Sequence, residues 1–319
     1  MRVLVTGGTG YLGRAVVSAL AGRGHDLVIF ARSATRSGLP GTLVDGDVRD
    51  RAALDRAADG CDAVLHAAAL VSIWCRRVQD FDDVNVGGLR NACGVAAGRK
   101  LHRIVYTSSF LALAPRDLPS AIAANDYQRT KVAADRVADE AVAGGAPLIR
   151  VYPGVIYGPG IFTEGNLVGR LIADHLKGRL PGLIGPENRW SYAFVDDVAA
   201  GHCAALEGGL PGARYLLGGE NATQQRLFQI VERLTGRPQP RRIPFAIAKA
   251  LGAAEELRVT MFGGTPLVTR GAVEIFRHDW SLDSSVAARD LGYRMTPLED
   301  GVRRTVRAIA GRAARSMSE

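Results

Sequence analysis

The glycine-rich segment at residues 6–13 is the feature that most restricts how this chain can fold. It reads Thr6-Gly7-Gly8-Thr9-Gly10-Tyr11-Leu12-Gly13 and lies between a short apolar run, Val3-Leu4-Val5, and the helical pattern of residues 15–20. Glycine lets the backbone turn tightly and approach a pyrophosphate, whose charge then rests on the N-terminus of the following helix. The spacing is G-x-x-G-x-x-G, at the first strand-to-helix turn, where this mechanism requires it. We therefore expect a phosphate-binding loop here.

Strand-like and helix-like segments alternate until about Gly160. This alternation predicts an α/β protein with a Rossmann-type doubly wound parallel sheet, which binds ligands at the carboxyl ends of its strands. We expect residues 1–158 to form this Rossmann-type domain, which would bind NAD(P), with residues 192–218 completing it. Residues 159–191 and 219–319, where the rhythm loosens, are expected to form a smaller C-terminal substrate-binding region. The strands expected before Gly160 span residues 3–5, 26–31, 43–44, 63–69, 101–107 and 147–152.

A tyrosine and a lysine stand four residues apart at Tyr127 and Lys131. This spacing places both side chains on one face of a helix. An ammonium beside a phenol favours the phenolate and brings the tyrosine closer to acid–base work at neutral pH. The strand that ends in Tyr106-Thr107-Ser108-Ser109 could supply a hydroxyl to hold a substrate oxygen beside them. Alone, the same spacing also describes a solvated helix face, so its meaning depends on the rest of the chain.

The end of the second expected strand favours one cofactor over another. An acidic residue near this position would bind the ribose 2′-hydroxyl of NAD, whereas an arginine accommodates the 2′-phosphate of NADP. No acidic residue occurs between Val28 and Gly41, and Arg32 follows the strand directly. We therefore expect NADP(H) to be favoured over NAD(H), with Arg32 and Arg36 as candidate ligands. Asp47, at the end of the third strand, is a candidate partner for the adenine amino group.

Composition limits the classes of partner. The net charge of +8 is spread along the chain and is densest between Arg303 and Arg315, which favours a solvated amphipathic helix over a nucleic-acid surface. The four cysteines and six histidines have no metal-ligand spacing, so no metal site is expected. No apolar run is long enough to span a membrane, and the chain begins with a strand pattern. We expect a cytoplasmic protein without a nucleic-acid partner.

These motifs together resemble the extended short-chain dehydrogenase/reductase family over nearly the whole chain. The similarity is nearest to the branch of dihydroflavonol reductases, 3β-hydroxysteroid dehydrogenases and farnesol dehydrogenase-like proteins. Four stretches carry that closer similarity: residues 67–71, 106–110, 152–155 and 277–281. The motifs that match the family in order are Thr6 to Gly13, Asp47-Val48, His66 to Ala69, Asn85 to Gly88, Thr107 to Ser109, Tyr127 to Lys131 and Phe194 to Val198.

The resemblance implies a catalytic tetrad of Asn85, Ser109, Tyr127 and Lys131, in which Ser109 is preferred to Ser108 because the family's serine is the later of this run. It further implies an NAD(P)-dependent oxidoreductase that interconverts an alcohol and a ketone or aldehyde. Two departures are the short loop between residues 112 and 125 and a threonine, Thr130, where serine is common. The implied cofactor contacts are Gly7, Thr9, Gly10, Tyr11, Leu12, Gly13, Arg32, Asp47, Val48, Ala67, Ala68, Ala69, Thr107, Lys131, Tyr152, Pro153, Gly154 and Val155.

Two other functions remain open at this point. A nucleotide-sugar epimerase or dehydratase shares the fold and tetrad, but that branch usually offers an asparagine where Val155 stands. A noncatalytic NADP-binding regulatory protein shares the fold, although it would not need the serine, tyrosine and lysine together. Apolar residues near the expected pocket favour a hydrophobic small-molecule substrate, and the resemblance implies a terpenoid, steroid or flavonoid-like one. A homodimer is compatible with the sequence. These apolar residues are Leu70, Val71, Ile73, Trp74, Phe110 and Leu111.

Overall fold

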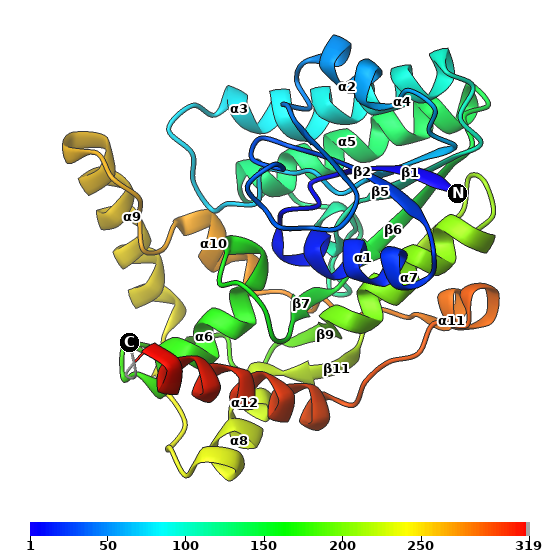
Figure 1. The fold of residues 1–319 in the computed structure, drawn as a ribbon. Coiled ribbons are helices and arrows are strands. Elements are labelled where there is room, and N and C mark those ends of the chain that lie inside the picture. Colours follow the sequence, from blue (N-terminus) through cyan, green and yellow to red (C-terminus); the bar gives the residue numbers. More distant parts are fainter. Residues whose placement is uncertain (317–319) are drawn as a thin grey trace.

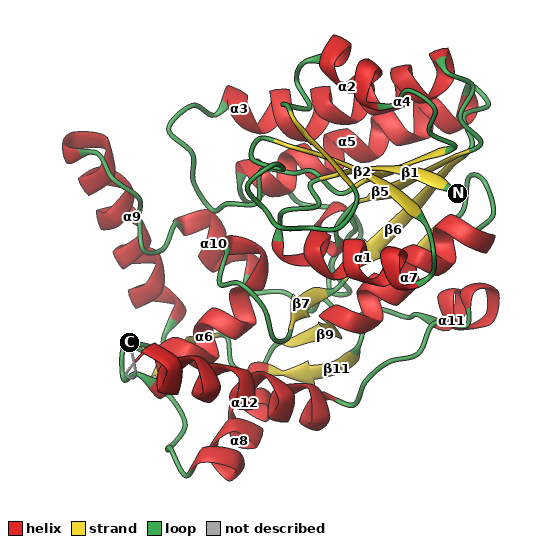
Figure 2. Cartoon of the chain, in the orientation of Figure 1, coloured by secondary structure: helices red, strands yellow, loops and turns green. Residues whose placement is uncertain are grey.

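The computed structural model describes residues 1–316 and is built around one seven-stranded sheet with helices on both faces (Figures 1 and 2). All neighbouring strands run parallel, in the order β10-β6-β5-β4-β1-β2-β3, which confirms the predicted doubly wound sheet. The strands are β1 (Arg2–Thr6), β2 (Asp26–Ala31), β3 (Thr42–Asp45), β4 (Ala63–His66), β5 (Arg103–Thr107), β6 (Leu148–Pro153) and β10 (Arg214–Leu217).

Helices cover both faces of this sheet, which explains why its central strands are apolar on both sides. One face packs against α1 (Tyr11–Gly22) and α7 (Val195–Gly208), which lie against each other. The other packs against α2 (Arg51–Ala57), α4 (Gly88–Gly98) and α5 (Asp126–Ala143). Figure 2 shows the two helical layers on opposite sides of the yellow strands.

A smaller layer lies below the carboxyl ends of the main strands (Figure 1). Its three-stranded sheet has the order β11-β9-β7 and packs with three helices into a separate apolar core. Asn166 and Thr223 begin two of these helices, because their side chains accept hydrogen bonds from Gly169 N and Arg226 N. The elements are β7 (Val155–Tyr157), β9 (Arg189–Phe194), β11 (Glu220–Thr223), α6 (Leu167–Leu176), α8 (Gln224–Thr235) and α12 (Leu298–Ser316).

The remaining elements connect these two layers. The strands β8 (Leu183–Ile184) and β12 (Arg242–Ile243) form a short parallel pair, followed by α9 (Phe245–Phe262), α10 (Arg270–Ile275) and α11 (Ser285–Leu291). The expected arginine-rich C-terminal helix is α12, although the side chain of Arg315 lies outside the described part. Within residues 1–316, no helix is both long and apolar enough to cross a bilayer.

The order of the main strands reverses direction beside β1, where β2 lies on one side and β4 on the other. Open parallel sheets bind ligands in the crevice at such a point.

The segment before β5 departs from a regular helix. The short α3 (Gln79–Phe81) passes through a π-helical turn at Asp82–Gly87 before α4 begins, and such turns are frequent at functional sites.

Candidate active site

A cleft of about 630 Å³ crosses the carboxyl ends of β1, β4 and β5 and continues toward α10. Ser109, Tyr127 and Lys131 line it, and so do all of the predicted cofactor residues except Tyr152. The geometry therefore brings the glycine loop and the tyrosine–lysine helix to one site, although they are more than 100 residues apart in sequence. Asn85 and Arg36 are not part of the lining.

The glycine loop forms a cradle that fits a dinucleotide phosphate. Gly7 has φ +73°, and a Cβ there would lie 2.6 Å from Ala68 N, so the loop presses directly against the end of β4. A Cβ on Gly13 would lie 2.1 Å from Gly7 O. The N-terminus of α1 has no side-chain cap and no acidic residue in its first turn. Its N–H groups are therefore available for an anion.

Tyr152 does not reach the cleft, which corrects its prediction as a cofactor contact. Side chains alternate along a strand, so Tyr152 shares the α5 face of β6 with Arg150. Its hydroxyl donates to the Asp135 carboxylate at 2.8 and 2.9 Å, and its side chain is completely buried. The next residues, Pro153 and Gly154, do line the cleft.

Lys131 is held by the strand that delivers the serines. Its side chain is only 3% exposed, and Nζ donates a 3.0 Å hydrogen bond to Thr107 O at the end of β5. The ammonium lies 5.3 Å from the ring centroid of Tyr106 and 6.0 Å from that of Tyr127. The helical spacing thus places the lysine beside the tyrosine, as predicted from the sequence.

The pKa of Tyr127 differs from the sequence-based expectation. Burial raises it to about 12, and the hydrogen bond from the neighbouring Ser109 hydroxyl only partly offsets this rise. Burial also lowers the pKa of Lys131 to about 8, with Asp135 acting in the opposite direction. Loss of solvent therefore determines the direction of the Tyr127 pKa shift, in place of the lowering expected from the lysine. Tyr127 is protonated at neutral pH.

The two consecutive serines have different environments. Ser109 Oγ accepts from Leu111 N at 3.2 Å and so begins the short 3₁₀ turn Phe110–Ala112 beside Tyr127. Ser108 Oγ instead donates to Asp135 at 3.2 Å. Because Ser108 is occupied by this buried carboxylate, the geometry favours Ser109 as the serine that works with Tyr127.

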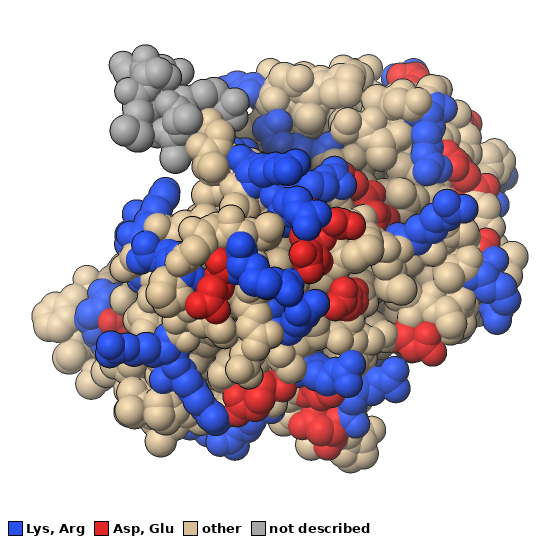
Figure 3. Space-filling model, turned by 90° about the horizontal axis from the view of Figure 1, so that it is seen from below, with Lys and Arg blue, Asp and Glu red and all other residues tan. Residues whose placement is uncertain are grey.

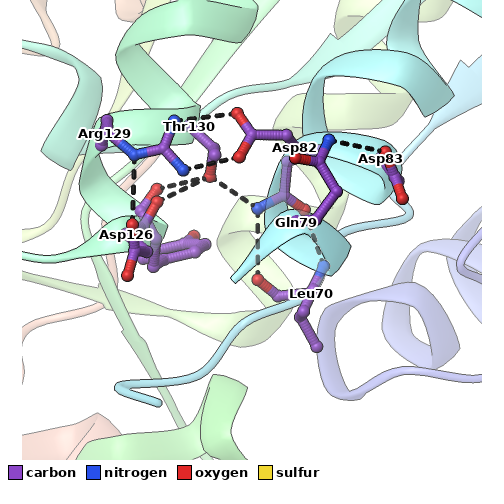
Figure 4. Close-up of polar contacts among 9 residues, drawn as sticks. Leu70, Gln79, Asp82, Asp83, Asp126, Arg129 and Thr130 are labelled. Carbon is purple, nitrogen blue, oxygen red and sulfur yellow. Dashed lines mark hydrogen bonds and ion pairs between the residues drawn. The ribbon is translucent and has the colours of Figure 1, made fainter. Parts of the chain in front are cut away.

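Asn85 lies behind the cleft, in the π-helical turn. Its Oδ1 accepts from Leu70 N at 2.7 Å, and its Nδ2 donates to Leu70 O and to Thr130 Oγ1 at 3.3 and 2.9 Å. Figure 4 labels Leu70 and Thr130, the two residues to which Asn85 bonds. Asn85 thus connects the loop after β4 to α5. The bond to α5 requires a hydroxyl at position 130, which threonine supplies as serine would.

An arginine next to Thr130 reinforces the same junction. Arg129 forms a two-pronged pair with Asp82, at 2.8 and 2.6 Å, and a 3.1 Å contact with Asp126 (Figure 4). Planar guanidinium–carboxylate pairs fix orientation as well as distance. The Arg129–Asp82 pair and the Asn85–Thr130 bond therefore both connect the π-helical turn to the N-terminal part of α5.

Gln128 is a residue whose role the sequence analysis missed. It is fully buried, its Oε1 accepts from Ala124 N at 3.0 Å, and its Nε2 donates to Leu111 O at 3.3 Å. These partners lie at the two ends of the short loop between Ser109 and Tyr127. Gln128 therefore closes that loop, and its only sequence signal is its place immediately after the tyrosine.

A segment far along the chain holds the middle of the same loop. The Asp117 carboxylate accepts from His278 Nδ1 at 2.8 Å and from Asp279 N at 3.2 Å. Arg116 N donates to Asp279 O at 2.8 Å. The Arg277–Ser281 stretch singled out by resemblance therefore contacts the loop between the proposed catalytic serine and tyrosine.

The end of the cleft toward α10 is largely aromatic and apolar. Trp190 stacks on Phe276 with ring centroids 4.8 Å apart, and Trp280 meets Phe110 edge-on at 5.4 Å. Trp190, Phe110 and Phe276 line the cleft. Trp74, also expected there, instead lines a separate hollow with Val259. The loop after β4 adds Leu70, Val71 and Ile73 to the cleft.

Known proteins are similar to this chain over nearly its full length. The model of the NAD-dependent epimerase/dehydratase family matches residues 3–218. Sterol demethylase protein B of Methylococcus capsulatus is 33% identical over 309 residues, which cover 92% of this chain and 93% of that protein. A putative dihydroflavonol 4-reductase of Synechocystis sp. is 27% identical over 317 residues, covering 93% and 91%.

Solved structures show the same arrangement of elements. The crystal structure of gox2253 has a TM-score of 0.81 and 29% identity, and covers 97% of this chain and 98% of that one. A UDP-glucuronic acid 4-epimerase from Bacillus cereus has a TM-score of 0.76 at 19% identity, covering 98% and 99%. The second likeness, at that identity, concerns the fold alone.

Proposed function

The chain belongs to the NAD-dependent epimerase/dehydratase family, and we propose that it interconverts an alcohol and a ketone or aldehyde on a hydrophobic small molecule. The observation that carries this proposal is the meeting of Tyr127, Ser109 and Lys131 at the apolar end of the cleft. NADP(H) is the proposed cofactor. Arg32, which lines the cleft at the end of β2, supports the preference for a 2′-phosphate.

The cradle of Gly7, Gly10 and Gly13 would hold the pyrophosphate at the N-terminus of α1. The Asp47 carboxylate is less available to bind the adenine amino group than expected, because Arg49 donates to both of its oxygens, at 3.0 and 2.8 Å. When bound, the nicotinamide group supplies or accepts the hydride. The family binds NAD(P), and several related solved structures carry NAD.

The protein side of the reaction is a proton transfer at Tyr127 Oη. The high pKa of Tyr127 keeps the phenol protonated at neutral pH, the state that can protonate a carbonyl oxygen. Ser109 Oγ is proposed to hold that oxygen by a hydrogen bond. Lys131 stabilises the phenolate that remains, and Asn85 fixes the position of α5 through Thr130. Oxidation of an alcohol uses the same groups in reverse.

The lining favours a hydrophobic substrate over a nucleotide sugar. Phe110, Trp190 and Phe276 form an aromatic wall, and Val155 stands in the cleft where the epimerase branch usually offers an asparagine. An apolar wall with a few placed polar groups is typical of a site for a hydrophobic small molecule. A nucleotide-sugar epimerase is the second candidate, since it would use the same fold and tetrad.

The test follows the absorbance of NADPH with a panel of hydrophobic ketones and aldehydes, including farnesal. Removing the Tyr127 hydroxyl in Tyr127→Phe is expected to lower turnover about 100- to 10,000-fold, the usual contribution of a general acid. Binding of NADPH should be unchanged, because the glycine cradle is intact. The matched control is Tyr192→Phe, since Tyr192 is buried but does not line the cleft. Full activity in Tyr127→Phe, or turnover of UDP-hexoses alone, would contradict the proposal.

The cofactor preference has its own test. Arg32→Ala should weaken binding of NADPH and leave binding of NADH unchanged, whereas Arg36→Ala should change neither, because Arg36 does not line the cleft. Equal affinity of the wild type for NADPH and NADH in a fluorescence titration would overturn the preference for NADP.

A further inference from the structure

The helix α9 presents an apolar side to solvent. Only Ala248, Gly252 and Val259 of its eighteen residues are buried, and the spacing of these three puts them on one side of the helix. The exposed positions of the helix carry mainly apolar residues, among them those at 247, 250, 251, 254, 257 and 261. Figure 1 shows α9 projecting from the body of the molecule. Packing against the rest of the protein therefore does not explain why the exposed positions of this helix are apolar.

The exposed apolar residues are concentrated here. Of thirteen large hydrophobic residues exposed in the described part, six fall between residues 247 and 267, and Phe262 and Leu267 are 79% and 87% exposed. Scattered apolar residues on a surface need no explanation, but a contiguous cluster marks an interaction site. We call this cluster the α9 face; its members are Ile247, Leu251, Leu257, Met261, Phe262 and Leu267.

A run of positive charge leads into the helix. Residues 233–254 contain five basic residues and no acidic one. Two of the five, Arg237 and Arg241, lie in the exposed loop before α9 and take part in no ion pair among residues 1–312, although Arg237 donates to Leu176 O at 3.2 Å. Figure 3 shows the molecule from below, with Lys and Arg side chains interspersed with Asp and Glu over this side of the surface. The five basic residues are Arg233, Arg237, Arg241, Arg242 and Lys249.

The two acidic residues of α9 are already neutralised. Glu255 accepts two bonds from Arg258, at 3.0 and 2.9 Å, and Glu256 pairs with Arg270 at 2.7 Å. Arg258 adds a further 3.0 Å bond to Thr265 O. The two carboxylates therefore repel an approaching anionic surface only weakly. The positive charges of Arg237 and Arg241 before the helix are not neutralised in this way.

The α9 face also adjoins the substrate end of the cleft. The chain passes from α9 into α10, whose Ala272 and Ile275 line the cleft. The far end of α9 meets the loop after β4 at a hollow lined by Trp74, Arg76 and Val259. The segments that follow α9 and contact its far end are therefore the ones that line the cleft or continue from it.

We propose that the α9 face and the basic loop before it dock on an anionic lipid surface, with α9 lying in the plane of the interface. Exposed apolar side chains next to basic residues can bury in the acyl boundary of a bilayer while the basic residues meet its headgroups. Basic clusters near such a helix bind anionic headgroups. A second copy of the chain is the weaker occupant, because the carboxylates of its own α9, Glu255 and Glu256, are already paired and would not neutralise the basic loop.

Vesicle flotation tests this proposal without any substrate or cofactor. The probes are vesicles of phosphatidylcholine mixed with phosphatidylglycerol and vesicles of phosphatidylcholine alone. The wild type should float with the mixed vesicles, and less so at high salt. The triple variant Ile247→Ser, Leu251→Ser, Phe262→Ser should bind at least about tenfold more weakly. Leu210→Ser is the matched control, because Leu210 is 61% exposed and lies outside the α9 face.

A second variant separates the electrostatic contribution. Arg237→Ser with Arg241→Ser should weaken binding to the mixed vesicles and remove most of its salt dependence, because screening acts on these charges. Absence of flotation by the wild type would overturn the proposal, as would flotation of the triple variant at the wild-type level. A wild-type dimer in sedimentation velocity that the triple variant abolishes, without vesicle binding, would also overturn it and assign the face to a second copy.

Discussion

Two helices of equal length, α5 and α9, use their residues in opposite ways. Each has eighteen residues, but α5 carries seven charged residues and α9 only four. Nevertheless α5 buries seven residues, including Lys131 and Asp135, whereas α9 buries three. The more polar helix lies in the core and the more apolar helix lies at the surface.

The difference follows from what satisfies each side chain. On α5, the buried polar groups form hydrogen bonds within the protein. Lys131 donates to Thr107 O, Gln128 bonds to the backbone at the ends of the Ser109–Tyr127 loop, and Thr130 accepts from Asn85. Burying these groups is tolerated because the bonds replace water. On α9 the outward apolar residues have no partner in the described chain. Chemistry explains the polar interior, and a docking surface would explain the apolar exterior.

The largest expected effect on this comparison comes from Gln128→Leu. It leaves Leu111 O and Ala124 N without their partner, at a cost of about 1–3 kcal/mol for each buried group. It also releases the loop between Ser109 and Tyr127, and a displacement of about 1 Å at a reacting group lowers kcat/KM about 100-fold. Steady-state kinetics and denaturant unfolding measure the two effects.

The matched control is Gln239→Leu, which removes one exposed bond to Glu232. Stability and kcat/KM of this variant should remain near the wild type. An unchanged kcat/KM in Gln128→Leu would show that the loop does not need this closure.

The pH dependence of ketone reduction gives the next effect. Lys131, whose pKa burial lowers to about 8, is charged below that pH and neutral above it. Because the ammonium stabilises the phenolate formed from Tyr127, the rate of reduction should be constant below about pH 7 and fall about tenfold per unit above pH 8. Tyr127 itself stays protonated over this range. A rate that stays constant to pH 10, with the fold intact by circular dichroism, would contradict this role.

The smallest expected effect is on stability. Val137→Ser in α5 removes a side chain that is 6% exposed and should lower the free energy of unfolding by about 2 kcal/mol. Ile247→Ser in α9, where the side chain is 53% exposed, should change it by less than about 0.5 kcal/mol. Urea unfolding compares both variants with the wild type. A large loss in Ile247→Ser would mean that the α9 face is part of the core.

Much of the fold could be predicted because its signals are local. The run Val3-Leu4-Val5 followed by the glycine loop contains its own strand, turn and helix N-terminus, and β1 and α1 form there. The prediction missed the π-helical turn at Asp82–Gly87, because that turn departs from the period on which helical patterns are recognised.

The site was less predictable than the fold. The Asp117–His278 contact joins residues 161 positions apart, and no local spacing indicates it. Tyr152 was misplaced because resemblance cannot show which face of β6 a side chain occupies. The direction of the Tyr127 pKa was also wrong, since burial depends on the elements packed around the phenol rather than on the neighbouring lysine.

The sequence by itself determined the alternation of strands and helices, the glycine cradle and the one-face spacing of Tyr127 and Lys131, because helix and strand geometry fix these over a few residues. Only the tertiary structure decided that Gln128 closes the loop, that Ser108 is occupied by Asp135, and that the apolar side of α9 faces outward. Burial, hydrogen-bond partners and pKa values depend on contacts between segments that are distant in sequence, and these contacts form only in the complete fold.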